Sequence, residues 1–80
     1  MPILLMFGKA REVAGTSRAN FSDQTLEELM TSATERFGEP FTRVLNISRV
    51  WVDGSPPEPG VITPLGPSSE VTVLPPVAGG

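Results

Sequence analysis

The 80-residue sequence contains no cysteine and no histidine, and its only lysine is Lys9. Without cysteine, the chain can form neither a disulfide nor a thiolate zinc site. Without histidine, it lacks the commonest general base and a frequent metal ligand. We therefore expect that this chain holds no metal, binds no cofactor and supplies no catalytic group of its own.

Long apolar segments and concentrated positive charge are also missing. No apolar run approaches the roughly 20 residues of a transmembrane helix, and no basic region precedes the short apolar run near the N-terminus. The net charge is −3 and the six basic residues are scattered, which argues against nucleic-acid binding. The sequence predicts a cytoplasmic domain with neither a membrane nor a nucleic acid as a partner.

The composition is typical of one small globular domain, with 39% hydrophobic and 19% charged residues. A chain this short buries only about 60–65% of the surface of its unfolded state, so its core is small. We divide the chain into a folded domain over residues 1–74 and a flexible tail over residues 75–80.

The end of the chain, EVTVLPPVAGG, is its most distinctive stretch. Glu70–Leu74 alternates as a strand, with Val71 and Val73 on one face. Pro75-Pro76 then ends the strand ladder, because proline has no backbone N–H to donate. The four residues Val77–Gly80 carry no side chain larger than valine, and the final two glycines leave the terminal carbonyl unhindered. The pattern predicts a slim tail that fits a narrow tunnel in another protein.

Two strands are expected before the main helix. In Pro2–Gly8 the alternate residues Ile3, Leu5 and Phe7 point one way and the others point the opposite way, as in a central strand covered on both sides. Lys9–Gly15 is interpreted as a polar turn or a single helical turn. Thr16–Phe21 is predicted to be a second strand that forms a hairpin with the first.

The clearest predicted element is a helix over Thr25–Phe37, whose apolar residues recur at helical spacing on one face. Thr25 and Glu28 fit the S/T-x-x-E capping box at its start. Gly38 is expected to stop the helix, and Pro40 to prevent its resumption.

The second half of the chain is less regular. Phe41–Ile47 is interpreted as either a short helix or an irregular turn that closes one end of the core. Ser48–Asp53 is predicted to be a strand with Trp51 on the face opposite its valines. Ser55–Pro67 carries five of the nine prolines and reads as a connector, with room for a short strand at Val61–Thr63.

A family resemblance rests on both ends of the chain. Leu4–Gly15, LLMFGKAREVAG, combines an apolar strand with an R-E-x-x-G turn, and the chain finishes with a strand followed by PPVAGG. These motifs and the helix between them resemble the MoaD/ThiS family of ubiquitin-like sulfur carrier proteins, in particular the small subunit of molybdopterin synthase. The sequence departs from that pattern in the proline-rich connector and at Leu74, where an aromatic residue is often found.

The resemblance implies an α+β fold of the β-grasp, ubiquitin-like type. Its mixed sheet has four to five strands, with the first and last strands parallel at the centre, one main helix across one face and an extended C-terminal tail. Phe7 and Leu74 would then lie on the open face beside the root of the tail, as an apolar docking patch. We assign Trp51 to the same docking surface.

The resemblance also implies the chemistry of the tail. A carboxylate is a poor electrophile, so an ATP-dependent, ubiquitin-activating-type enzyme would adenylate Gly80, and sulfur would then displace AMP to leave a thiocarboxylate. The ATP is used by that enzyme and is not bound by this chain. Because the chain has no cysteine, any sulfur it carries has to sit on the terminal carboxylate. The tail residues available for recognition are Pro75, Pro76, Val77, Ala78 and Gly79.

The implied second partner is the large subunit of molybdopterin synthase, in a heterotetramer. Three alternatives remain open: a thiocarboxylate carrier for cysteine, thiamine, tRNA thiolation or a secondary metabolite; a ubiquitin-like modifier of target lysines; and a β-grasp interaction module without terminal chemistry. The R-E-x-x-G motif favours the synthase subunit, whereas the segment NISRVWVDG loosely resembles carriers of the cysteine pathway.

Overall fold

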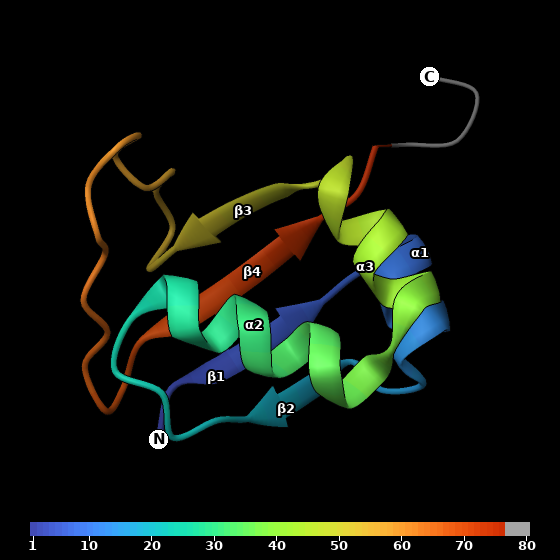
Figure 1. Ribbon diagram of the computed structural model, residues 1–80, viewed down its shortest axis with the longest axis horizontal. Helices are drawn as coiled ribbons and strands as arrows, with labels where there is room; N and C mark the ends of the chain where they lie inside the picture. The colour runs from blue at the N-terminus through green and yellow to red at the C-terminus, as the bar shows by residue number, and fades with distance from the viewer. Residues whose placement is uncertain (77–80) are drawn as a thin grey trace.

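A computed structural model describes residues 1–76 of the chain, which form a four-stranded mixed sheet (Figure 1). The strands are β1 (Ile3–Met6), β2 (Arg18–Asn20), β3 (Arg49–Val52) and β4 (Glu70–Leu74), in the spatial order β2-β1-β4-β3. The central strands β1 and β4 pair in parallel, and both outer pairs are antiparallel. The predicted β-grasp arrangement is confirmed.

Alternation along the two central strands separates a core face from an outer face of the sheet. The inward side chains of β1 and β4 are fully buried, whereas their neighbours on the outer face are half-buried or, at Glu70, exposed. This difference matches the predicted alternation. The inward set comprises Leu4, Met6, Val71 and Val73.

Helix α2 (Leu26–Phe37) crosses the core face of the sheet, as predicted (Figure 1). Leu26, Leu29 and Ala33 are its buried residues. Thr25 is the N-cap, and its Oγ1 accepts a hydrogen bond of 3.1 Å from the backbone N–H of Glu28. The reciprocal bond of the capping box goes one residue further back than predicted, because the Glu28 carboxylate accepts from the N–H of Gln24 at 3.3 Å.

The cap makes a testable contribution to stability. Thr25→Ala removes the acceptor and leaves the Glu28 N–H without its partner, so we expect a loss of about 1 kcal/mol in the free energy of unfolding. Thermal denaturation should show a midpoint lower by about 4–8 °C. Thr25→Ser keeps the hydroxyl and should remain within about 0.5 kcal/mol of the parent; equal losses in both variants would contradict the capping role.

Two further helices are α1 (Gly8–Ala14) and α3 (Glu39–Asn46). Helix α1 corrects the sequence interpretation, whereas α3 agrees with the helical alternative for Phe41–Ile47. The segment predicted to be a turn or a single helical turn is a seven-residue helix that ends at Gly15, whose φ is 77°. The expectation that Pro40 prevents resumption of a helix after Gly38 is wrong, because a new helix begins at Glu39, directly before Pro40. Pro40 lies in the first turn of α3, where a missing N–H costs no hydrogen bond.

Helices α1 and α3 lie together at the end of the sheet where β1 and β4 finish (Figure 1). Phe41 and Val44 of α3 and Ala10 of α1 are buried there, so α3 closes one end of the core as the sequence suggested. None of the helices in residues 1–76 is long and apolar enough to cross a membrane.

The connector between β3 and β4 contains no strand at Val61–Thr63, contrary to the proposed short strand. It is joined to the start of α2 by two backbone hydrogen bonds of 2.8 Å, from Leu26 N–H to Thr63 O and from Leu65 N–H to Gln24 O. A third bond of 3.2 Å runs from the Thr63 N–H to the carboxylate of Glu27. An isolated bridge joins Thr25 to Pro64. The prolines limit ladder formation, because each one removes a backbone donor.

Side chains and turns occupy the two edges of the sheet. On β2, the Oγ1 of Thr16 bonds both the C=O and the N–H of Arg18, and the guanidinium of Arg36 donates to the C=O of Asn20 at 3.2 Å. On β3, Val52 exchanges two backbone bonds with the turn residue Ser55. Few free backbone groups remain for an incoming strand, so a face of the sheet is better suited to partner contact than an edge.

Candidate functional site

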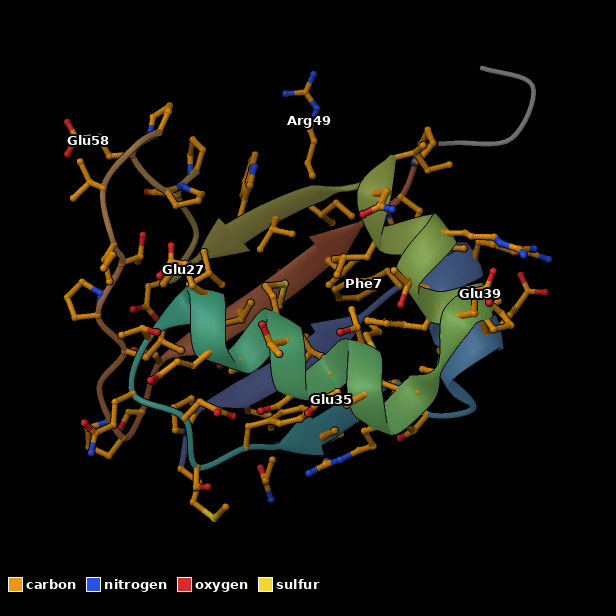
Figure 2. The ribbon with its side chains drawn as sticks, viewed as in Figure 1. Phe7, Glu27, Glu35, Glu39, Arg49 and Glu58 are labelled. Carbon is orange, nitrogen blue, oxygen red and sulfur yellow. The ribbon has the colours of Figure 1, made fainter. Side chains whose placement is uncertain are left out.

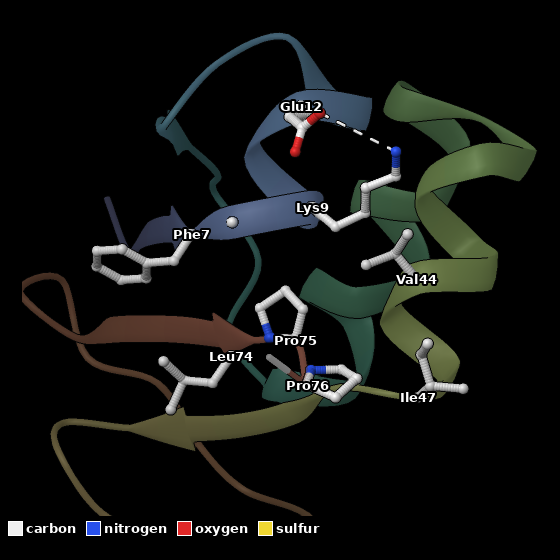
Figure 3. A pocket seen from close by; sticks show the side chains of 9 residues that line it. Phe7, Lys9, Glu12, Val44, Ile47, Leu74, Pro75 and Pro76 are labelled. Atoms are coloured by element: carbon white, nitrogen blue, oxygen red, sulfur yellow. Dashed lines mark ion pairs between the residues drawn. The ribbon is translucent and has the colours of Figure 1, made fainter. Parts of the chain in front are cut away.

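A groove opens at the end of the molecule where the chain leaves β4 (Figure 3). It has a volume of about 750 Å³ and is walled by the end of β4, the start of α1 and the end of α3. We call it the tail-root groove. Its lining residues are Phe7, Gly8, Lys9, Glu12, Val44, Ile47, Leu74, Pro75 and Pro76.

The alternation of β1 and a change of backbone direction place Phe7 in this groove. Phe7 follows Met6, which points into the core, so the aromatic side chain faces outward and remains 51% exposed. The next residue, Gly8, has a φ of 52°, a conformation that β-carbon-bearing residues adopt rarely, and it begins α1. The turn at Gly8 therefore lets the chain pass directly from a central strand into the helix that forms one wall.

Leu74 and the two prolines form the opposite wall. Leu74 is the last residue of β4 and is half-buried on the outer face, next in line to the buried Val73. Pro75 is half-buried and Pro76 is exposed. A β-carbon added at Gly8 would lie 4.0 Å from the Cγ of Pro75, so the start of α1 and the root of the tail are in van der Waals range.

One ion pair lies on the rim of the groove. The Nζ of Lys9 is 4.0 Å from a carboxylate oxygen of Glu12, and the two side chains are 64% and 67% exposed (Figure 3). A pair this long and this exposed to water contributes little to stability. Both side chains are therefore free to exchange this contact for another.

The structure brings together two of the three predicted docking residues. Phe7 and Leu74 face the same groove, whereas Trp51 is outside it, on the middle of β3 and paired across the strands with Thr72. Trp51 is 37% exposed on the outer face of the sheet. Arg49, two residues before it on the same face, is paired across the strands with Leu74 (Figure 2). Trp51 thus belongs to the outer face of the sheet but not to the groove.

Sequence reasoning missed the contribution of α3 to the site. Val44 and Ile47 line the groove, and Ile47 is 68% exposed. The available signal was Ile47, an apolar residue that follows the buried positions Phe41 and Val44 of a short amphipathic segment. That segment was also compatible with an irregular turn. An exposed isoleucine and an exposed phenylalanine that line one groove indicate a surface adapted for contact with another molecule.

The predicted tail residues Val77, Ala78, Gly79 and Gly80 lie outside the described residues, so their assigned roles stay predictions. Within residues 1–76, no group of three or more Asp and Glu side chains is arranged to hold a metal ion. The groove offers apolar contact area and one exposed amine. It is therefore suited to recognition and to presenting the tail that follows Pro76.

The sequence matches a known protein family over nearly its whole length. The model of the ThiS family matches residues 4–80. A search of curated proteins found no match.

Among solved structures, SAMP1 from Haloferax volcanii matches with a TM-score of 0.77 and 21% sequence identity, over 99% of this chain and 98% of that one. The small archaeal modifier protein 1 from Methanosarcina acetivorans matches with a TM-score of 0.78 and 24% identity, over 99% and 95% of the two chains. These TM-scores show a common fold.

Proposed function

Because this chain belongs to the ThiS family of ubiquitin-like sulfur carriers and modifiers, we propose that it carries sulfur as a thiocarboxylate on Gly80. One structural observation supports the proposal most: the exposed Phe7 and the half-buried Leu74 meet at the root of the tail. A partner that binds this groove fixes the position of the tail root and can direct the tail into the partner's active site.

The chemistry requires activation before sulfur transfer. The Gly80 carboxylate attacks the α-phosphorus of ATP, pyrophosphate leaves, and a mixed anhydride with AMP is formed. Sulfide then attacks the carbonyl carbon and AMP departs, leaving the thiocarboxylate. Attack by a persulfide gives an acyl disulfide instead, and a second thiol then cleaves its S–S bond, so that the thiocarboxylate is released and a disulfide is formed. This chain contributes the acyl group and the docking surface, and the enzyme partner contributes the acid–base groups and the metal-bound nucleotide.

The acceptor that we propose is the large subunit of molybdopterin synthase, which would receive the tail and use the sulfur to build a dithiolene. The R-E-x-x-G motif and the PPVAGG ending support this choice. In the fold the motif forms most of α1, and Glu12 of that motif lines the tail-root groove. The motif therefore lies where a partner holding the tail would touch it.

The intact mass of the protein tests the carrier role. After incubation with ATP, a cognate activating enzyme and a sulfur donor, we expect a mass gain equal to the exchange of one oxygen for sulfur, located at Gly80. The starting mass also establishes whether Gly80 is the free C-terminus. A variant without Gly79 and Gly80 should show no gain, while its thermal unfolding should match that of the parent. An unchanged mass with ATP unconsumed would contradict the proposal.

A second candidate function is protein modification, which the names of the similar solved structures favour. It uses the same activated Gly80 but passes the acyl group to a lysine amine of a target. The two functions differ in what the activated tail delivers, which is sulfur in the first case and the acyl group of Gly80 in the second. Sulfur appearing in the product of the large subunit supports the carrier, whereas a Gly80 isopeptide on target peptides after digestion supports the modifier.

A further inference from the structure

The single lysine of the chain lies at the root of the tail. Five of the six basic side chains are arginines, whose guanidinium groups stay protonated and do not act as nucleophiles at neutral pH. The exception, Lys9, lines the tail-root groove together with Pro75 and Pro76 (Figure 3). The proposed function uses Phe7 and Leu74 of this groove but gives no role to the amine.

The distances allow the end of the tail to reach this amine. The adjacent residue Gly8 is in van der Waals range of Pro75. Four residues follow Pro76, and four extended residues span at most roughly 13 Å. Lys9 is 64% exposed, and within residues 1–76 the one ion pair of its amine is the 4.0 Å contact with Glu12, so its side chain can turn towards the tail.

We infer that the Nζ of Lys9 is an intramolecular acceptor for the activated acyl group of Gly80, so that the chain can close on itself as a lactam. The inference depends on the proposed function only for the activation of Gly80. A short tether gives an effective concentration in the millimolar range, which exceeds that of a second copy at micromolar protein by about a thousandfold. Ring closure within one chain therefore dominates over linkage between chains.

The reaction balances without a further reagent. The unprotonated Nζ attacks the Gly80 carbonyl carbon, a C–N bond forms, and the C–O bond to AMP breaks. AMP leaves with the electron pair, and the proton of the ammonium passes to solvent. The product has lost one water relative to the free chain. It has no terminal carboxylate, so it can be neither adenylated nor loaded with sulfur again.

Lactam formation competes directly with sulfur loading. Both nucleophiles attack the same carbonyl carbon, so the fraction of chains that close rises when sulfide or persulfide is scarce. The closed chain also has its tail tied across the groove that contains Phe7 and Leu74. Closure thus removes the tail and the docking site together, and it limits the amount of active carrier.

The experiment uses a chain activated without any enzyme. The full chain with a Gly80 thioester, produced by intein cleavage, is held in mildly alkaline buffer, and its mass is followed. No cysteine of the chain can compete for the acyl group. We expect a monomeric product with a mass one water below that of the free acid and, after digestion, a Lys9–Gly80 cross-linked peptide.

Two variants and one solvent control test whether cyclisation depends on the position of the lysine in the folded chain. Lys9→Arg keeps the positive charge and should give only the hydrolysed acid. Lys9→Arg combined with Glu35→Lys moves the lysine to an exposed site on α2 and should cyclise at least about tenfold more slowly. Concentrated urea should also slow closure of the parent at least about tenfold, because an unfolded chain has to close a far longer loop.

Each alternative result overturns the inference. Hydrolysis alone in the parent, equal cyclisation with the lysine at position 35, or acylation of the Met1 amine instead of Lys9 would each do so. Because the thioester needs no activating enzyme, failure here leaves the sulfur-loading test unaffected. Conversely, failure of sulfur loading leaves the measured reaction of Lys9 with an activated Gly80 in place.

Discussion

Phe41→Ala is expected to lower the free energy of unfolding by about 3–5 kcal/mol. Phe41 is fully buried, and its ring centroid is 5.1 Å from that of Phe37 in a tilted arrangement. Truncation removes this contact and leaves a cavity in the core where α3 packs against α2. An 80-residue domain has a total stability of about 4–12 kcal/mol, so the variant should lose a large part of it.

Thermal and urea denaturation measure this effect, and the midpoint temperature should fall by about 12 °C or more. Phe7→Ala is the matched control, because it makes the same chemical change at a side chain that is 51% exposed. We expect it to cost less than about 1 kcal/mol. Similar losses at both positions would mean that the core does not depend on α3 as the structure indicates.

Phe7→Asp is expected to weaken binding to the proposed partners without unfolding the domain. The change places a charge in the tail-root groove, where a partner would exclude water and bury that charge without a counter-ion. A loss of about 2 kcal/mol or more is typical of a central aromatic contact and corresponds to roughly thirtyfold in Kd.

Calorimetric titration against the activating enzyme and the large subunit of molybdopterin synthase tests this expectation. Ile62→Asp is the control, because Ile62 is 69% exposed, belongs to the connector before β4 and is not one of the residues that line the groove. The control should bind as the parent does. If both variants bind normally, the groove is not the docking surface.

Local patterns in the sequence were sufficient to predict the helices and strands that have strong periodicity. The helix over Thr25–Phe37, its Thr25 cap and its end at Gly38 follow from helical spacing and from capping chemistry that involve neighbouring residues only. The alternation of Glu70–Leu74 likewise assigned the inward residues of β4 correctly. These features depend on interactions over a few residues, which a sequence displays directly.

Short segments were harder to predict, because their state depends on partners far away in the chain. Residues 39–46 contain a proline and fewer than three helical turns, and their helix is stabilised by burying Phe41 in the core. The absence of a strand at Val61–Thr63 has the same kind of cause. That segment bonds to the start of α2 instead of joining the sheet.

The sequence by itself determined the tail and its chemical limits: the glycine ending, the two prolines and the lack of cysteine and histidine are properties of the chain that no folding can alter. Only the tertiary structure decided which side chains share a surface with that tail. Parallel pairing of β1 with β4 brings residues from both ends of the chain to one end of the sheet, so Phe7, Lys9 and Leu74 line one groove there while Trp51 does not. This grouping arises from pairing between strands more than sixty residues apart, and local periodicity contains no information about such distant contacts.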